Sequence, residues 1–557
     1  MRFGSSSSLP PNSSSRGPLE SSSAEDDALR APSEDGGWLI EPLPCVGDAT
    51  VDFDRSAVIA TANSSRIDVA TARQELLSLA MNHTRRYRDV AWVDERASDA
   101  LVMAGHQPQW FHPGVWFKNG VLDRLAHRRG AIGINLVVDN DLCDSARLRF
   151  PSGSLDQPHW ETLALDRSGP AVPFEERTIL DEETFANAPR ELASRWPTWL
   201  ERPLLWDLHG ALADLDEQPA NLGERLAIAR HRLEASWGWR TLEVPLSQLC
   251  ETSSFRNFAA SLWSDARRLS ESYNQALWDH RQRYRIRSRS HPVPELESDS
   301  EWVESPFWIW SDEDPRRRRL FVRCDGEALS LTNGEGWSWS GGLGDWRDAT
   351  ESPAGKGIKI RTRALLTTWY TRAILCDRFI HGIGGAHYDR LTDEIVRRYW
   401  GVELPPFTTA TATVRLPVAS AAPTAKQLGE LSQRLRRLEY HPEEFLASLP
   451  SSMDDASEQA SCLSAKREWI ARSREPRALT YEERVARHAA IERANACLRP
   501  AAESIRADLL RERERLEKQQ RNFRILGSRE ISIAMHAGGD SLRRTFDKML
   551  STAFRDS

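Results

Sequence analysis

Two apolar runs of strand length, separated by one helix, restrict the fold of this chain more than any other feature. Residues 100–104 (ALVMA) form the first run and lead into the polar turn at residues 105–108. Residues 115–128 then carry apolar side chains at helical spacing, and residues 131–138 (AIGINLVV) form the second run. A continuous apolar run is typical of a strand buried on both faces of a parallel sheet. The order strand, helix, strand predicts a βαβ unit and therefore an α/β fold.

Polar residues follow each of the two predicted strands. Ligands of open α/β sheets bind beyond the carboxyl ends of the strands, where the two loops of a βαβ unit lie side by side. Glycine lets the backbone approach a ligand closely, and the exposed N–H groups at a helix start attract an anion. We therefore expect a ligand site here. The candidate catalytic residues are His106, Lys118, Asp139 and Asp141, and the candidate substrate- or phosphate-binding residues are Gly105, Gln107, His112, Gly114 and Asn140.

Each of these loops also has a purely structural interpretation. Residues 105–108 match neither a Walker loop nor the GxGxxG pattern, so they could form a tight turn whose histidines cap or pack. The acidic loop at 139–144 could bind Mg²⁺, orient an amine, act as acid and base, or be a solvated turn. Cys143 in this loop is more typical of a packed cysteine than of a catalytic thiol, because no base is evident beside it.

A glycine-rich segment at residues 382–389 is the third candidate. Gly384 and Gly385 could offer backbone N–H groups to an anion, and His387, Tyr388 and Asp389 would add polar side chains. A helix C-cap followed by a turn explains the same glycines. We expect an amphipathic helix to follow over residues 391–400.

The composition excludes several classes of protein. Lys and Arg number 74 against 81 Asp and Glu, and the net charge of −7 argues against a protein that mainly coats nucleic acid. No run of about 18 apolar residues occurs, so the sequence predicts no membrane span. The polar, Ser-rich start lacks the apolar segment of a secretory signal, and the seven cysteines contain no CxxC pair. We expect reduced cysteines and a cytoplasmic protein, with a small-molecule substrate and neither nucleic acid nor membrane as a partner.

Changes in composition divide the chain into four parts. Residues 1–35 are rich in Ser, Pro and acidic residues and predict a disordered tail. We expect a core over residues 36–425 with an insertion at about 150–300, whose role the sequence does not specify. A helical domain over residues 426–526 and a C-terminal tail over residues 527–557 follow.

Four leucines in the helical domain have the spacing of a coiled-coil seam. Leu428, Leu431, Leu435 and Leu438 are separated by three, four and three residues. A long charged helix over residues 482–524 supplies only half of such a seam. The helices could pair within the chain in antiparallel orientation, or they could form the surface of a homodimer.

Three segments resemble the family of bacillithiol biosynthesis cysteine-adding enzymes (BshC). Residues 104–118 (AGHQPQWFHPGVWFK) are similar to its Gly-Gln-Gln turn, which is followed by Gly-Pro and a lysine-bearing helix. Residues 132–144 stand where the family has a buried strand and an acidic Glu-Asp-His-Asp loop. Residues 379–406 are similar to its Gly-Gly-Pro-Gly-Glu-Ile-Ala-Tyr segment, the helix after it and a Gly-Val-Glu-Leu-Pro-Pro stop. Order and spacing agree over most of residues 95–525.

The resemblance implies a fold and an activity. The fold is a Rossmann-like parallel-sheet core related to nucleotidylyltransferases, with inserted connecting segments and a helical coiled coil after it. The activity is that of a ligase, which joins cysteine to glucosaminyl malate through a carbon–nitrogen bond. ATP or ADP and a divalent cation are the cofactors consistent with this activity, and no metal ligands are assigned.

The chain departs from the family's pattern inside the expected pocket. His106 stands where the family has glutamine, the acidic loop lacks the family's histidine, and His387 stands where the family has glutamate. Such positions set specificity, so a relative that acts on another amine, acid or thiol fits the sequence as well. The alternative function is a non-catalytic protein that binds a nucleotide or small molecule and assembles through its coiled coil.

Overall fold

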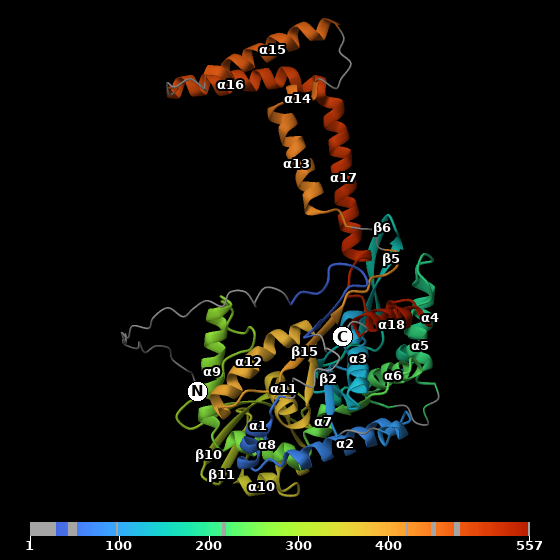
Figure 1. Ribbon diagram of the computed structural model, residues 1–557, viewed down its shortest axis with the longest axis vertical. Coiled ribbons are helices and arrows are strands. Elements are labelled where there is room, and N and C mark those ends of the chain that lie inside the picture. The colour runs from blue at the N-terminus through green and yellow to red at the C-terminus, as the bar shows by residue number, and fades with distance from the viewer. Residues whose placement is uncertain are drawn as a thin grey trace.

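The computed structural model describes residues 29–42, 53–95, 99–213, 215, 219–418, 422–446, 453–472 and 479–554. Figure 1 shows an α/β body and a helical arm that projects from it. Among the described helices, none combines the length and the apolar character that crossing a bilayer requires.

A six-stranded sheet forms the centre of the body, and five of its strands run parallel. Strand β1 pairs antiparallel with β15 at one edge. In spatial order the strands are β1 (Trp38–Glu41), β15 (Phe407–Ala412), β14 (Arg378–His381), β2 (Leu101–His106), β3 (Ile132–Val137) and β8 (Leu242–Pro245).

The predicted βαβ unit is confirmed. Strands β2 and β3 pair in parallel, with His106 opposite Val137, and helix α3 (Pro113–Arg128) connects them. Both faces of β2 are buried, because Met103 packs into one apolar core and Val102 into the other. Burial on both faces explains why the sequence of this strand is continuously apolar and does not alternate.

The strand order reverses at β2. From β2 the chain moves to β3 and β8 on one side, and it later returns to β14 and β15 on the other side. The connections that leave the carboxyl ends of β2 and β14 therefore diverge. In open α/β sheets such a point is where ligands bind.

Helices cover both faces of the sheet (Figure 1). One apolar core joins the sheet to α1 (Ser56–Ser64), α2 (Val69–Arg85), α8 (Ser253–Trp263), α9 (Ala266–Arg283), α11 (Ala364–Tyr370) and α12 (Ile383–Trp400). The second core joins the other face to α3, α4 (Glu182–Arg195), α5 (Leu205–Gly210), α6 (Leu222–Ser236) and α18 (Ser541–Ala553).

A second sheet in the body is antiparallel. Its strand order is β12 (Ser338–Gly342), β11 (Ala328–Thr332), β10 (Arg318–Asp325), β9 (Val303–Ser311) and β13 (Ile358–Thr362). Shorter elements are β4 (Leu142–Cys143) with β7 (Val172–Pro173), the hairpin of β5 (Arg147–Ser154) and β6 (Gln157–Ala164), α7 (Leu246–Leu249), α10 (Leu343–Arg347) and a π-helical turn, Thr371–Leu375. The stretch predicted as an insertion at about 150–300 also contains β8, so part of it belongs to the central sheet.

Residues 29–35, which the composition assigned to the tail, lie against the body. Thr413 Oγ1 donates to Pro32 O at 2.7 Å, and an Arg415 guanidinium nitrogen donates to Ser33 O at 2.7 Å. The Gly36 N–H donates to Thr413 O at 2.8 Å. These bonds continue the pairing of β1 with β15, which explains how a polar segment is held. Residues 1–28 of the predicted tail lie outside the described residues.

The arm consists of α13 (Ala425–Tyr440), α14 (Glu443–Leu446), α15 (Met453–Arg472), α16 (Tyr481–Leu498) and α17 (Glu503–Leu526). Helices α13 and α17 lie side by side and run in opposite directions (Figure 1). Leu431 and Leu438 of α13 pack with Leu509 and Leu516 of α17. The leucine spacing therefore predicted the packed face of α13, and the helix it packs on belongs to the same chain.

The hairpin of β5 and β6 braces the base of the arm. Asn522 Nδ2 of α17 donates to the carbonyl oxygens of Leu155 and Asp156, both at 3.1 Å. Lys518 Nζ lies 3.7 Å from a carboxylate oxygen of Asp156. Contacts of α17 with the body therefore help to set the direction of the arm.

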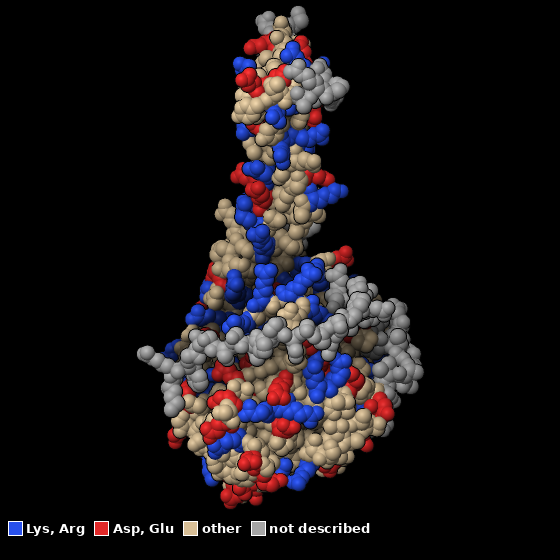
Figure 2. Space-filling model, turned by 90° about the vertical axis from the view of Figure 1, so that its left-hand side faces the viewer, with Lys and Arg blue, Asp and Glu red and all other residues tan. Residues whose placement is uncertain are grey.

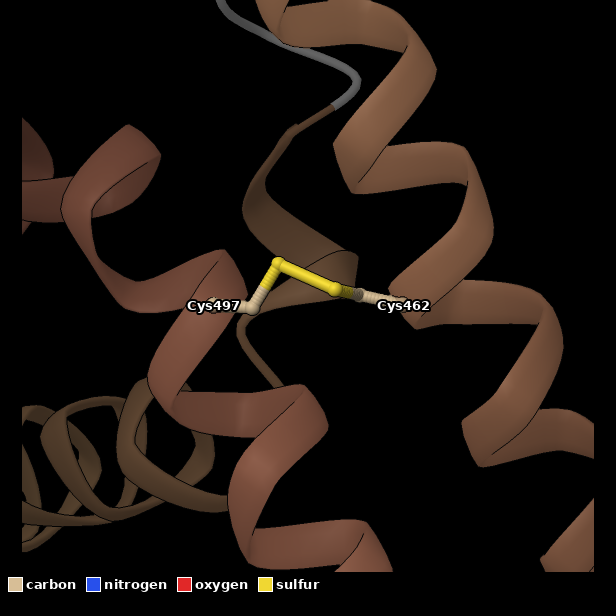
Figure 3. Close-up of a disulfide and its surroundings, with 2 residues drawn as sticks. All are labelled: Cys462 and Cys497. Carbon is tan, nitrogen blue, oxygen red and sulfur yellow. A yellow bond between two sulfur atoms is a disulfide. The ribbon is translucent and has the colours of Figure 1, made fainter.

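A disulfide joins Cys462 of α15 to Cys497 of α16 at the far end of the arm (Figure 3). The expectation of reduced cysteines is wrong at this pair. The described free thiols are Cys143, Cys250, Cys324 and Cys376. The paired cysteines are 35 residues apart and belong to no short motif, so only the folded arm reveals the pair.

Cys462→Ser is expected to loosen α15 and α16 while the body keeps its stability. A crosslink that closes a loop of this length stabilises a fold by roughly 2–4 kcal/mol. Hydrogen exchange measured by mass spectrometry should show faster exchange in α15 and α16 and unchanged exchange in β2 and β3. Cys324→Ser, which removes a free thiol of β10, is the control. Equal exchange of the arm in both variants would contradict a structural role of the disulfide.

Candidate active site

The junction of β2 and α3 brings Gly105 and Lys118 together. A Cβ at Gly105 would lie 3.2 Å from Leu136 O and 3.3 Å from Leu136 Cβ, so glycine allows β2 and β3 to approach closely here. Lys118 returns on α3 to the carboxyl end of β2, where its Nζ donates to Gly105 O at 2.5 Å. The Lys118 side chain is buried, with 1% of its surface exposed.

The start of α3 explains His112 and Gly114. His112 Nδ1 accepts the Gly114 N–H at 3.1 Å, so this histidine is the N-cap of α3, and its Nε2 lies 3.3 Å from Glu530. A Cβ at Gly114 would lie 2.3 Å from Ala412 O and 2.8 Å from an Arg529 nitrogen. Glycine therefore lets α3 pack directly on β15. The structural interpretation, that a histidine of this segment caps, is confirmed for His112.

A cavity of about 680 Å³ lies at the carboxyl ends of β2 and β14. It brings together the segments at 105–118 and 382–385, which the sequence indicated separately. Eight of the predicted residues line it: Gly105, His106, Gln107, His112, Gly114, Lys118, Gly384 and Gly385.

The other four predicted residues are not among those that line this cavity. Asp139 is buried and accepts hydrogen bonds from the backbone N–H and the hydroxyl of Ser247. Asn140 donates to Thr362 O at 2.8 Å. The side chain of His387 is exposed on α12. The structure therefore uses Asp139 and Asn140 to hold loops together.

Asp141 confirms that the two loops of the βαβ unit are neighbours. Its carboxylate accepts a hydrogen bond from Gln107 Nε2 at 3.0 Å and one from Arg317 at 3.2 Å. Asp141 therefore reaches the cavity only through Gln107, which lines it. Within the described residues, no group of three or more His, Cys, Asp and Glu side chains is placed to hold a metal ion.

Burial shifts the pKa values of two residues that line the cavity, and of Asp139 in the neighbouring loop. It lowers the pKa of Lys118 to about 7, and the charge of Arg230 acts in the same direction. Burial also lowers the pKa of His106 to about 3, with a further contribution from Lys118. For Asp139, burial and then Glu175 raise the pKa to about 7, although Ser247 opposes the shift. At neutral pH His106 is therefore neutral, and Lys118 can exchange its proton.

Helix α12 begins at Ile383, eight residues before the start predicted from the sequence. The interpretation of residues 382–389 as a C-cap and turn is therefore wrong, because Gly382 is the N-cap of α12. No side chain caps this helix start, and Gly384 and Gly385 of its first turn line the cavity. Backbone N–H groups at such a helix start attract anions.

Sequence reasoning missed a buried polar cluster at the end of β14. His381 Nε2 lies 2.7 Å from an Asp389 carboxylate oxygen, and Arg372 donates to the same oxygen at 2.7 Å. Both His381 and Asp389 line the cavity. The signal available in the sequence was a histidine that ends a short apolar strand directly before a glycine-rich helix start.

Segments from both ends of the described body form the outer wall of the cavity. Residues 29–31 line it from one side, and Arg529 and Glu530, which follow the arm, line it from the other. One Arg529 nitrogen lies 3.3 Å from Thr411 Oγ1. Figure 2 shows Lys and Arg side chains gathered where the arm meets the body.

The cavity suits a small ligand that carries a carboxylate or phosphate. Lys118, Arg30 and Arg529 supply positive charge, and the carboxylates of Asp389 and Glu530 already face His381 and His112. Three histidines of the wall can accept or donate protons. No protein-family model matches the chain, and no curated protein sequence matches it either.

Proposed function

We propose that the chain is a ligase that joins the amine of one small polar molecule to the carboxyl group of another. Cysteine and glucosaminyl malate, the substrates of the BshC family, are the first pair to test. The body would be a Rossmann-like core, with the pair of α13 and α17 as its coiled coil. The strand order supports this proposal, because β3 and β8 follow β2 on one side while β14 and β15 lie on the other.

One observation carries the proposal: Lys118, His106 and His381 come from three elements and line one cavity at the point where the strand order reverses. Lys118 is buried, yet the partner of its Nζ is a neutral carbonyl oxygen. A buried cation without a carboxylate is costly unless a ligand supplies the negative charge. The carboxylate or phosphate of a substrate would supply it.

Each group then has a defined task. Lys118 and the free N–H groups at the start of α12 would hold the anionic group. Neutral His106, whose ring centre lies 4.3 Å from that of Phe111, would polarise the carbonyl group by hydrogen bonding. Holding both substrates in one cavity would supply much of the rate enhancement. ATP is the co-substrate to test first, and we assign no metal ligand.

The test is a thermal-shift screen of the whole chain against ATP, ADP, cysteine, malate and glucosaminyl malate, each with and without Mg²⁺. A ligand that binds only the folded protein at 100 times its Kd stabilises it by about 2.7 kcal/mol. Stabilisation by an amine or acid substrate, followed by product detection by mass spectrometry, would support the proposal. Stabilisation by no compound would make the family's substrates wrong for this chain.

His106→Ala is expected to abolish turnover and to leave the fold intact, because the side chain lines the cavity and its ring contacts only Phe111 and, through Nδ1, the adjacent Gln107 O at 3.3 Å. His209→Ala on α5, outside the cavity, is the matched control and should keep wild-type turnover. Circular dichroism and the unfolding midpoint check both folds. Normal turnover by His106→Ala would contradict the assigned role.

A binding protein that assembles through its arm is the second candidate. The arm exposes large apolar side chains: Tyr440 is 50%, Tyr481 75% and Val485 53% exposed. Such residues favour contact with another protein surface. Stoichiometric ligand binding without consumption would favour this candidate, and light scattering at several concentrations would test assembly.

A further inference from the structure

The pair of His381 and Asp389 fixes the position of one ring proton. Asp389 is buried, and His381 and Arg372 keep its pKa well below 3.8 although burial alone would raise it. An ionised carboxylate only accepts hydrogen bonds. His381 Nε2, 2.7 Å from it, must therefore carry the proton, which leaves the lone pair on Nδ1.

Nδ1 of His381 faces the glycine-lined start of α12. A Cβ at Gly385 would lie 2.6 Å from Nδ1, so the ring fits here only because residue 385 is glycine. Among the described residues, none forms a hydrogen bond with Nδ1. His381 and Gly385 both line the cavity. The free nitrogen thus lies at the cavity wall, beside the proposed anion site.

We infer that His381 is the general base of this site and that Asp389 is its positioning residue. This assignment rests on the proposed function: His381 would be the base that activates a primary amine substrate. In this step one N–H bond of the substrate ammonium breaks and an Nδ1–H bond forms. The proton moves to the ring, the electron pair stays on the amine nitrogen, and Asp389 offsets the charge of the imidazolium.

The surroundings keep the ring neutral before the reaction. Burial lowers the pKa of His381 below 6.5, Asp389 opposes this shift, and the charges of Arg372 and Lys118 add to it. The groups around the ring are Asp389 of α12, Arg372 of the π-helical turn, Lys118 of α3, and the rings of Phe379 and Phe407. Arg372 also pairs with Asp393 at 2.8 Å. A neutral imidazole is the form that can accept a proton.

His381→Gln tests the base directly. Glutamine can still donate a hydrogen bond to Asp389, so the buried carboxylate keeps a partner, but an amide cannot accept the proton. Because general base catalysis contributes about 10²–10⁴-fold, kcat should fall by that factor while KM changes little. His209→Gln is the matched control and should keep kcat. A kcat of His381→Gln within about threefold of wild type would overturn the inference.

A second measurement needs no substrate. In the full chain labelled with ¹⁵N-histidine, the Nδ1 signal of His381 should be that of an unprotonated nitrogen at pH 7, and Asp389→Asn should change it. Gly385→Ala should shift this signal by displacing the ring. Gly384→Ala, where a Cβ meets nothing within 4 Å, controls for the added methyl group and should leave the signal in place. A protonated Nδ1 in the wild type would overturn the inference.

The two proposals fail in different ways. If the wild type consumes no amine substrate, the ligase proposal fails. The nitrogen signals still show whether the His381 ring carries its proton on Nε2 and leaves Nδ1 free, as a base requires. If the wild type is active and His381→Gln is equally active, the ligase proposal stands and the assignment of the base fails.

Discussion

Lys118→Met is expected to raise the free energy of unfolding by several kcal/mol at pH 6 and to abolish anion binding in the cavity. Burial lowers the pKa of Lys118 from 10.5 to about 7, and this displacement corresponds to roughly 5 kcal/mol. Methionine fills similar space without a charge. The loss of the hydrogen bond to Gly105 O reduces the gain by about 1 kcal/mol.

The sign of the pH dependence follows from the lowered pKa. Between about pH 7 and pH 10.5 the unfolded chain keeps the proton on Lys118 and the folded chain releases it. Proton release in the folded state makes the wild type more stable as pH rises through this range. The advantage of Lys118→Met is therefore greatest below pH 7 and declines towards pH 10.

Lys466→Met is the matched control. Lys466 on α15 is also 1% exposed, but its Nζ pairs with Glu443 at 2.7 Å and donates to Tyr440 O at 2.8 Å. Its removal should destabilise the arm, because Glu443 loses its partner. Urea unfolding at pH 6, 8 and 10 measures both variants. Equal loss of stability in the two variants would show that Lys118 has a carboxylate partner after all.

Arg230→Met is expected to destabilise the body by about 3–5 kcal/mol, since removing one member of a buried charge cluster leaves the others uncompensated. Arg230 pairs with Glu234 at 2.8 Å and with Glu243, and all three side chains are buried. Asn135 donates to Glu243 at 2.6 Å, so the cluster also joins β3 to β8.

The loss of stability in Arg230→Met should grow as pH rises, whereas the gain in Lys118→Met shrinks. Burial already raises the pKa of Glu243, and without Arg230 this buried carboxyl holds its proton to still higher pH than in the unfolded chain. Stability of the variant therefore falls as pH rises through about 4.3, and the deficit is smaller at pH 4 than at pH 7. Arg515→Met, at an exposed pair with Glu512, should change little. A deficit independent of pH would contradict this account.

The parts of the site that sequence patterns predicted are local in the chain. About one helix length of chain holds the βαβ unit, the turn at 105–108 and Lys118. The spacing of apolar residues and the residue types of the turn were therefore enough to predict them. The acidic loop was placed correctly beside this turn. The hydrogen-bond partner of Asp139 could not be predicted, because Ser247 lies 108 residues away and such a partner leaves no local signal in the sequence.

The contacts that the sequence did not indicate have a different physical cause. His381 meets Asp389 eight residues on and Arg372 nine residues before it, and the three converge only when α12 packs against the π-helical turn. The glycines in the first turn of α12 were interpreted as the end of a helix, because glycine is a poor helix former. In the structure, Gly385 is required by the His381 ring.

The outer wall of the cavity has a consequence for how the chain matures on the ribosome. Residues 29–31 leave the tunnel early, whereas Arg529 and Glu530 leave it only after the whole arm has been made. Strand β1 likewise pairs with β15, which is synthesised much later. A nascent chain that has already formed β2, α3 and β3 therefore carries His106 and Lys118 before the residues of the outer cavity wall have been made.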